Sequence, residues 1–181
     1  MRSSHFMTNP THPAKKRFSL IPKYSLRDIT DVTPEFLNKL GIKFLMMDLD
    51  NTIAAYDEFI LASDVLEWIN NIKDSGVKLF IISNSTRKNR VEDHSESIGV
   101  GFIMESFKPS PKSLFHAMEL EGFGTEASAL AGDQIFTDTL AANRAGIVSI
   151  LVRPRRFTNP FLALRYFIEL PFRAMCKNKI K

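Results

Sequence analysis

The stretch "MMDLDNTIAAYD", residues 46–57, is the part of the sequence from which the fold is best inferred. Its first two residues complete the apolar run Phe44–Met47, which predicts a buried strand. Asp48 and Asp50 follow directly after that run. Carboxylates are costly next to a buried strand, so their position favours a functional site at the strand end over a plain turn.

Four more short apolar runs follow along the chain, separated by segments with helical spacing. They are Val77–Ile82, Val100–Met104, Ala127–Ala131 and Ile147–Val152. Each run is continuous instead of alternating, which is typical of strands covered on both faces. The alternation predicts an α/β fold, with a mainly parallel sheet of about five strands and helices on both faces.

The segments between the runs carry helix start and stop signals. The expected helices begin at an N-cap at Ser63, near Arg87, at an N-cap at Ser110 and near Asp138, and they end at Gly76, Gly99, Gly122 and Gly146. Glycine at a helix end suits a backbone that leaves the helix through the left-handed region.

Size and composition indicate a globular chain with basic ends. The 181 residues are 44% hydrophobic and 24% charged, which allows one domain with a sizeable core. The net charge is +4; the first acidic residue is Asp28, and Glu169 is the one acidic residue after Arg153. Basic ends suit an anionic membrane surface or a nucleic acid, with plain solvated tails as the alternative.

Cysteine usage and hydropathy limit the compartment. Cys176 is the single cysteine, so no internal disulfide and no Cys/His zinc cluster is expected. No apolar run approaches the roughly 18 residues that span a bilayer, and the first residues lack the apolar core of a secretory signal. They weakly resemble a transit peptide, but their prolines favour a flexible basic tail over residues 1–28. We expect a cytoplasmic protein.

Polar side chains follow four of the predicted strands. Asp48 and Asp50 follow the first strand, Ser83 the second, Lys108 the third and Asp133 the fourth. The carboxyl ends of parallel strands meet at one edge of the sheet, which is where such sheets bind ligands. Three carboxylates, a hydroxyl and an ammonium should therefore lie together.

Hard oxygen ligands without a nearby histidine suit Mg²⁺, and we expect Asp48, Asp50 and Asp133 to bind it. Whether Asp138 joins them is left open, since an acid near a helix start has its own structural reason. A cation beside a lysine can hold a phosphate dianion and lets a carboxylate attack phosphorus. Lys108 is the expected lysine, with Lys112, one helical turn later, as the alternative.

This chemistry predicts a role for each residue. Asp48 is the expected nucleophile, which forms an aspartyl-phosphate. Asp50 protonates the leaving oxygen and then deprotonates the attacking water, and Lys108 completes the catalytic set. The expected phosphate-binding residues are Asn51, Thr52, Ser83, Asn84 and Lys108.

Four motifs resemble those of the haloacid dehalogenase superfamily. They are "DLDNT" at 48–52, Ser83, Lys108-Pro109 and "GDQIFTD" at 132–138, in the superfamily's order. The resemblance covers roughly residues 40–153. It implies a Rossmann-like three-layer α/β/α fold, Mg²⁺ dependence and phosphohydrolase activity. An aspartate at position 50 is the phosphatase form of the pattern, which dehalogenase members lack.

The spacing of these motifs leaves no room for a cap domain. Asp50 and Ser83 are 33 positions apart, and Ser83 and Lys108 are 25 apart, which one helix and one strand use up each time. Superfamily members that act on small metabolites usually carry a cap. A capless site therefore implies a larger substrate, such as a lipid head group, a protein or a nucleic-acid end.

Three longer stretches resemble the YqeG-type subfamily, which is related to the phosphatidylglycerophosphate phosphatases of mitochondria and plastids. They are "ITDVTPEFLNKLGIKFLMMDLDNTIAAYD", "KPSPKSLFHAM" and "AGDQIFTDTLAANRAGIVSILVRP". This resemblance implies a place in phospholipid metabolism.

The C-terminal segment, residues 155–181, mixes aromatic and basic residues on a predicted helix. They are Phe157, Phe161, Leu162, Leu164, Phe167, Ile168 and Phe172, with Arg155, Arg156, Arg165, Arg173 and Lys177. Such a helix suits an anionic membrane interface. A helix packed on the domain is the alternative, and Pro171 should interrupt the helix.

We therefore predict a flexible tail over residues 1–28, a capless phosphatase domain over 29–154 and a basic amphipathic segment over 155–181. The preferred function is Mg²⁺-dependent hydrolysis of phosphatidylglycerophosphate by a protein in peripheral contact with the inner face of a membrane. Nucleic acid is the less favoured partner. A soluble phosphatase of sugar, nucleotide or protein phosphates is one alternative, and a non-catalytic binding module is another.

Overall fold

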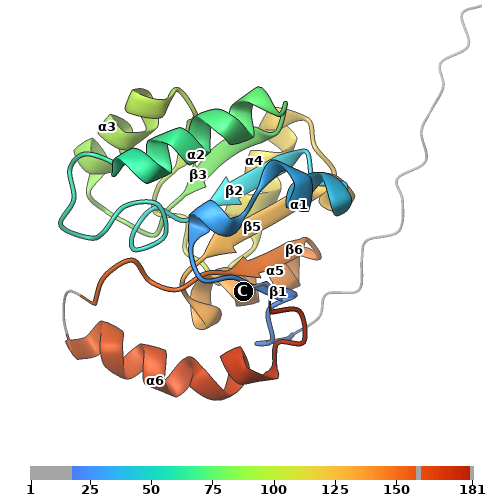
Figure 1. Ribbon diagram of the computed structural model, residues 1–181, viewed down its shortest axis with the longest axis vertical. Coiled ribbons are helices and arrows are strands. Elements are labelled where there is room, and N and C mark those ends of the chain that lie inside the picture. Colours follow the sequence, from blue (N-terminus) through green and yellow to red (C-terminus); the bar gives the residue numbers. More distant parts are fainter. Residues whose placement is uncertain (1–17, 158–159, 180–181) are drawn as a thin grey trace, which may run out of the picture.

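The computed structural model describes residues 18–157 and 160–179 (Figure 1). Its strands form one six-stranded, all-parallel sheet in the order β1-β6-β5-β2-β3-β4. The strands are β1 (Tyr24–Ser25), β2 (Phe44–Met47), β3 (Lys78–Ile82), β4 (Gly101–Ile103), β5 (Ser128–Gly132) and β6 (Val148–Leu151). The predicted α/β fold with a parallel sheet is confirmed.

The described residues also form six α-helices and three short helical turns, and the last α-helix follows the last strand. The α-helices are α1 (Pro34–Lys39), α2 (Ser63–Asp74), α3 (Lys88–Ile98), α4 (Lys112–Glu121), α5 (Leu140–Ala145) and α6 (Pro160–Met175). The turns are Ile29–Asp31, Thr125–Ala127 and Ile135–Thr139, of which the last is π-helical.

The helix ends follow the sequence signals more closely than the starts. Gly99, Gly122 and Gly146 are the C-caps of α3, α4 and α5, each with a positive φ, as predicted. Two predicted N-caps are wrong by one residue, because Ala62 and Pro111 take the cap positions of α2 and α4. Among the described residues, neither cap makes a side-chain hydrogen bond to its helix.

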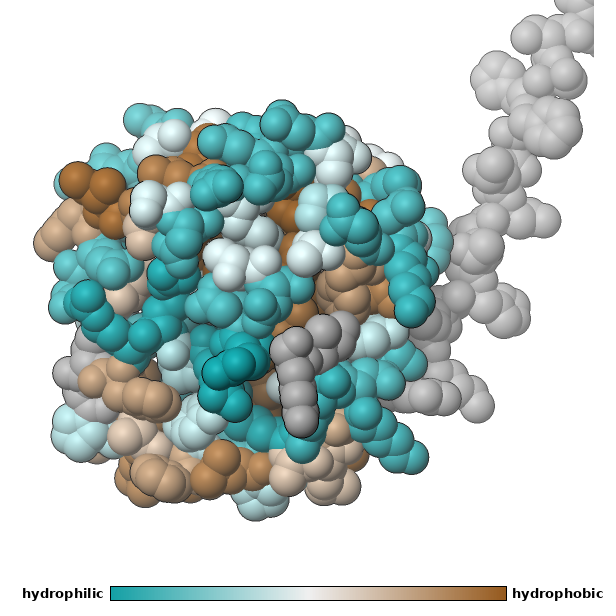
Figure 2. Space-filling model, in the orientation of Figure 1, coloured by the Kyte–Doolittle hydropathy of each residue, from teal (hydrophilic) through white to brown (hydrophobic). Residues whose placement is uncertain are grey.

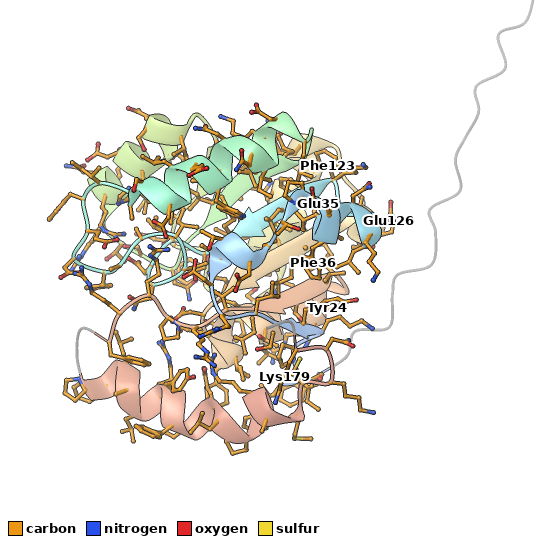
Figure 3. All side chains as sticks on the ribbon, in the orientation of Figure 1. Tyr24, Glu35, Phe36, Phe123, Glu126 and Lys179 are labelled. Carbon is orange, nitrogen blue, oxygen red and sulfur yellow. The ribbon has the colours of Figure 1, made fainter. Side chains whose placement is uncertain are left out.

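Strand β1 corrects the expected extent of the N-terminal tail. Tyr24 and Ser25 pair with β6 at the edge of the sheet, inside the region expected to be flexible. The Tyr24 ring meets the Phe36 ring edge-on, with 5.1 Å between centroids (Figure 3). A two-residue strand has no periodic pattern that a sequence could display. The rest of the expected tail, residues 1–17, lies outside the described residues.

The side chains of β2 divide the interior into two cores. Leu45 and Met47 pack in one core with the buried face of α2, whereas Phe44 and Met46 pack in the other with α4 and α5. All four are fully buried, and burying such a side chain stabilises the fold by about 1.5–3 kcal/mol. The centre of the sheet is therefore covered on both faces, which fixes the carboxyl end of β2.

Helix α6 lies on the β1 and β6 side of the domain (Figure 1), and its Leu162 and Arg165 line a cavity together with Asp48, which follows β2, and Asn84, which follows β3. Within the described chain, no inserted domain interrupts the sequence between β2 and β5. None of the described helices is both long and apolar enough to cross a bilayer. The expected interruption at Pro171 is wrong, because α6 continues through it to Met175. Glu169 and Arg173, on either side of Pro171, are buried and tie this part of the helix to the domain.

Candidate active site

The centre of the site is a buried lysine between two buried carboxylates. Lys108 Nζ lies 2.6 Å from Asp48 Oδ1 and 2.7 Å from Asp138 Oδ1. The same ammonium donates to the carbonyl of Ile82 at 2.7 Å. All three donor directions of the ammonium are thus used, and Lys108, instead of Lys112, is the lysine at the site.

A loop held by Asn84 places Lys108. The Asn84 Oδ1 atom accepts from the Lys108 N–H at 2.8 Å and from the Ser106 hydroxyl at 2.7 Å. Its Nδ2 donates to the Lys108 carbonyl at 3.0 Å. Asn84 was predicted to bind phosphate. In the structure its amide fixes the loop that carries the lysine, at the edge of the site cavity.

Asp50 faces a partner that the sequence reading missed. Arg90 Nη1 donates to Asp50 Oδ1 at 2.8 Å, and Arg90 Nη2 donates to the Ala55 carbonyl at 2.7 Å. Burial raises the pKa of the Asp50 carboxyl, although the positive charge of Arg90 acts in the opposite direction. Arg90 lies on α3, with nothing in its local sequence to mark it.

Asp133 is buried at the end of β5 and is held from α6. Its Oδ2 lies 3.4 Å from Arg165 Nη2, and its carbonyl accepts from Arg173 Nη2. Among the described residues, no hydrogen-bond partner meets its Oδ1. Burial raises the pKa of Asp133 well above its usual value, and the charges of Asp48 and Asp138 raise it further.

Three carboxylates could hold a cation together. Asp48, Asp133 and Asp138 each offer an oxygen, and these atoms lie within 4.8 Å of one another. The group is buried, oxygen-only and includes the unpartnered Asp133 Oδ1, which fits a hard divalent cation. Asp138, which the sequence left open, joins the group. Asp50 lies outside it, so a metal-binding role for Asp50 remains a prediction.

Burial and neighbouring charges have opposing effects on the pKa values of Asp48 and Lys108. Burial raises the pKa of Asp48 to about 7, with Lys108 acting in the opposite direction and Asp138 reinforcing the rise. Burial alone would lower the pKa of Lys108, but the carboxylates of Asp138 and Asp48 outweigh it and raise that pKa above its usual value. A bound cation would add positive charge and stabilise the ionised carboxylates.

The remaining predicted phosphate-binding residues differ in position: Thr52 contacts Asp48, Asn51 lines the cavity, and Ser83 is not among the described residues that line it. The Thr52 hydroxyl donates to Asp48 Oδ2 at 3.3 Å. Asn51 has a φ of 63°, a region that asparagine tolerates, and it lines the site cavity. The Ser83 hydroxyl is buried and accepts from the Ser85 N–H at 3.0 Å, so it stabilises the turn after β3.

Helix α6 holds the loop after β5. The sequence predicted residues 155–181, which contain α6, as a segment separate from the domain. Glu169 Oε1 accepts from the Ile135 N–H at 2.9 Å, and Glu169 Oε2 lies 2.9 Å from Arg173 Nη2. Arg173 also donates to the Val152 carbonyl at 3.2 Å. Charged residues repeat every four positions at 165, 169 and 173, a spacing that could have indicated this inward-facing surface.

A cavity of about 310 Å³ opens above the carboxylates. It is lined by Asp48, Asp50, Asn51, Tyr56, Asn84, Ser85, Thr86, Arg87, Lys108, Gln134, Thr137, Leu162 and Arg165. A larger cavity of about 600 Å³ lies near the amino ends of β1 and β6, but none of the described residues that line it carries a carboxylate. The smaller cavity is therefore the candidate active site.

Comparison with known proteins agrees with this geometry. The family of haloacid dehalogenase-like hydrolases matches residues 10–152. The probable phosphatase YqeG of Bacillus subtilis (strain 168) is 34% identical over 147 residues, which cover 81% of this chain and 84% of that protein. The resemblance inferred from the motifs is confirmed.

A second relative and a solved structure extend the comparison. Phosphatidylglycerophosphate phosphatase 1, chloroplastic/mitochondrial, of Arabidopsis thaliana is 29% identical over 161 residues, 82% of this chain but only 45% of that protein. The 3-deoxy-D-manno-octulosonate 8-phosphate phosphatase from Moraxella catarrhalis, in complex with magnesium, phosphate and its KDO molecule, is 20% identical. It superposes with a TM-score of 0.52 over 81% of each chain, which shows a common fold. The chain therefore belongs to the haloacid dehalogenase-like hydrolases, as an enzyme of their phosphatase group.

Proposed function

We propose that this phosphatase hydrolyses the phosphomonoester of phosphatidylglycerophosphate through an aspartyl-phosphate on Asp48, with Mg²⁺ as the cation. The observation that carries the chemistry is the buried group of Asp48, Asp133 and Asp138, with oxygens within 4.8 Å, beside Lys108. A nucleophile, a cation site and a fixed ammonium together are what phosphoryl transfer requires.

In the first half-reaction, a carboxylate oxygen of Asp48 bonds to phosphorus as the bond from phosphorus to the leaving oxygen breaks. Lys108, 2.6 Å from Asp48, offsets negative charge at the reacting group. Asp50 gives its proton to the leaving oxygen. Burial raises the pKa of this carboxyl, and the positive charge of Arg90 acts in the opposite direction.

In the second half-reaction, Asp50 accepts a proton from water, and the water oxygen attacks phosphorus. The bond between phosphorus and Asp48 breaks, which releases inorganic phosphate and leaves Asp50 protonated for the next cycle. Arg90, 2.8 Å from Asp50, holds that carboxyl in one orientation through both steps.

The cation would be held by Asp48, Asp133 and Asp138. When bound, Mg²⁺ supplies positive charge that stabilises the phosphoryl oxygens and the ionised nucleophile. The name of the Arabidopsis relative supports the choice of lipid, and the magnesium in the Moraxella structure supports the choice of metal.

The surface of α6 supports a lipid substrate. A surface helix normally turns its apolar face inward, but α6 turns Glu169 and Arg173 inward. Its exposed apolar residues are Phe161, Leu164, Phe167, Ile168, Leu170 and Met175. Figure 2 shows apolar residues gathered along α6 at the bottom of the view. A patch of this kind indicates an interaction surface, and we propose that it contacts a bilayer.

Fewer of the basic residues in segment 155–181 are available to an anionic membrane than the sequence suggested. Arg165 and Arg173 point toward the site, and Arg155 pairs with Asp28 and Asp64. Exposed Lys177 and Lys179 follow the end of α6 and suit an anionic leaflet. Leu162 and Arg165 line the cavity from the same helix, so a membrane under α6 would bring lipid head groups beside the cavity.

A substrate panel tests the proposal. Turnover is measured with phosphatidylglycerophosphate in mixed micelles and with glycerol 3-phosphate, a hexose phosphate, a nucleotide and a phosphopeptide. We expect kcat/KM for the lipid to exceed the others by about a hundredfold, loss of activity with a chelator and recovery with Mg²⁺. Preference for a soluble phosphate would support the soluble phosphatase instead, and no turnover of any substrate would favour a non-catalytic module.

A further inference from the structure

The site cavity contains more positive charge than one phosphate group requires. Lys108 lies between Asp48 and Asp138, whereas Arg87 and Arg165 line the cavity outside that group. We infer that Arg87 and Arg165 form a second anion subsite, which binds another phosphate of the same substrate. The inference rests on the proposed function and specifies the substrate class: molecules with a phosphomonoester and a second phosphate.

Arg87 enters the cavity from the connection between β3 and α3. Its Nη1 donates to the Tyr56 carbonyl at 3.3 Å, and its guanidinium lies 4.2 Å from the centre of the Tyr56 ring. This stacking orients the guanidinium while the side chain stays exposed. A guanidinium has five N–H donors, and within the described chain one of them is engaged by a hydrogen bond to Tyr56.

Arg165 enters the cavity from α6. Its closest carboxylate contacts are long for charged groups, 3.4 Å to Asp133 and 4.0 Å to Glu169. Its Nε is buried and has no hydrogen-bond partner among the described residues. The Arg165 side chain is 28% exposed and lines the cavity, so an anion in the cavity would offer its guanidinium a closer acceptor than either carboxylate does.

The two arginines approach from different sides of the reaction centre. β3 and β5 flank β2 in the sheet; Arg87 follows β3, and Arg165 contacts Asp133 at the end of β5. The other arginines near the centre are already bound, Arg90 to Asp50 and Arg173 to Glu169. A planar guanidinium binds phosphate oxygens in a two-pronged manner, which would fix the second phosphate while the first one reacts.

The test compares substrates with one and two phosphates. Dihexanoyl phosphatidylglycerophosphate has a phosphomonoester and a phosphodiester, fructose 1,6-bisphosphate has two monoesters without lipid, and 4-nitrophenyl phosphate has one. For Arg87→Gln, we expect KM for the lipid to rise about tenfold with kcat nearly constant. Arg165→Gln also loses the contact with Asp133, so it is assayed at saturating Mg²⁺ and compared through the ratio of its activities on two substrates. The ratio of kcat/KM for the lipid to that for the aryl phosphate should fall by a similar factor, about tenfold.

Lys88→Gln is the matched control, because it removes one charge next to Arg87 from an exposed side chain that does not line the cavity. It should leave the ratio within about twofold of wild type. Fructose 1,6-bisphosphate shows which second phosphate is bound. If the arginine variants lose activity on it as much as on the lipid, the subsite accepts any second phosphate. If they lose activity on the lipid alone, the subsite is specific for its phosphodiester.

The inference is wrong if the arginine variants change the ratio no more than Lys88→Gln does. It is also wrong if they raise KM for the aryl phosphate equally, since the arginines would then bind the reacting phosphate. Should Arg165→Gln unfold, Arg87→Gln alone decides. Absence of turnover with all three substrates in the wild type would instead contradict the proposed function. In that case, competitive displacement of inorganic phosphate by fructose 1,6-bisphosphate, in a calorimeter, tests the subsite: equal affinities in wild type and Arg87→Gln would overturn it.

Discussion

At the scale of single residues, the site depends on how burial and charge are balanced around Asp48. Burial raises its pKa to about 7, and Lys108 opposes that rise from 2.6 Å. Thr52 donates to the other carboxylate oxygen. One oxygen is therefore oriented by a hydroxyl and the other by an ammonium, which leaves the carboxylate fixed for attack.

The first prediction concerns the nucleophile. Asp48→Asn should reduce kcat for 4-nitrophenyl phosphate by more than about a thousandfold, because an amide cannot form the phosphoenzyme. The exposed Asp74→Asn is the matched control and should stay close to wild type. Activity of the Asp48 variant within tenfold of wild type would contradict the aspartyl-phosphate mechanism.

The second prediction concerns the acid. Asp50→Asn should slow alkyl phosphates by about 10²–10⁴-fold, because a poor leaving group needs a proton when its bond to phosphorus breaks. Nitrophenolate is a good leaving group that needs no proton from Asp50. A rapid-quench experiment with 4-nitrophenyl phosphate should therefore still show an initial burst of nitrophenolate, followed by slow hydrolysis of the phosphoenzyme. Equal losses with good and poor leaving groups in the first step would exclude Asp50 as the acid.

At the scale of elements, two features shape the cation group: the end of β5 and the inner face of α6. Gly132 ends β5 directly before Asp133. A Cβ added at Gly132 would clash with the Asp138 side chain. Glu169 on α6 binds the Ile135 N–H of the following turn. The positions of Asp133 and Asp138 therefore depend on both elements.

The third prediction tests the close approach at β5. Gly132→Ala should displace Asp138, raise the Mg²⁺ concentration needed for half-maximal activity by about tenfold and lower Tm. Gly124→Ala is the control, because its Cβ would meet the far end of the Glu126 side chain, which can move away. If the two variants bind Mg²⁺ equally well in calorimetry, the contact with Asp138 has no part in forming the cation site.

The fourth prediction tests whether α6 is part of the folded domain. Glu169→Ala leaves Arg173 and the Ile135 N–H without their carboxylate. Removing one partner of a buried ion pair costs about 3–5 kcal/mol, so urea unfolding should show a loss near the lower value. Glu169→Gln keeps an acceptor and should lose less. A loss below about 0.5 kcal/mol, typical of an exposed pair, would mean that α6 contributes little to stability.

At the scale of the whole molecule, α6 has two surfaces with different partners. Its inner surface holds the loop that contains Asp133, and its outer surface exposes apolar side chains. Packing on the domain and contact with a membrane, which the sequence left as alternatives, are therefore compatible. The cavity opens beside the same helix, so one element connects the proposed membrane surface with the reaction centre.

The fifth prediction tests the outer surface. Replacing Phe161, Leu164 and Phe167 with serine should weaken co-sedimentation with phosphatidylglycerol vesicles and slow hydrolysis of vesicle-borne phosphatidylglycerophosphate by about tenfold. These side chains are 80%, 58% and 65% exposed, so turnover of 4-nitrophenyl phosphate should persist. Replacing the exposed Phe59 and Ile60, which lie on the loop before α2, is the control. Unchanged vesicle binding in the triple variant would exclude α6 as the docking surface.

Much of the fold could be predicted from sequence, because its signals are local. The apolar runs that became β2 to β6 are continuous in the chain, and the glycines that end α3, α4 and α5 act on their own backbone. The order of parallel strands then brings Asp48, Lys108 and Asp133 to one edge. Strand β1 escaped prediction because two residues carry no pattern and pair only through β6.

What the tertiary structure alone decided is which charges meet. Asp50 pairs with Arg90, 40 positions away, and Asp138 lies 2.7 Å from Lys108. The sequence showed α6 as basic and apolar, but not that Arg173 binds inward. A side chain's partner depends on how distant elements pack, and an ionisable group is stabilised or destabilised by whatever charge that packing brings near. Local sequence determines the strand and its end; the packing of distant helices determines the chemistry of the residues placed there.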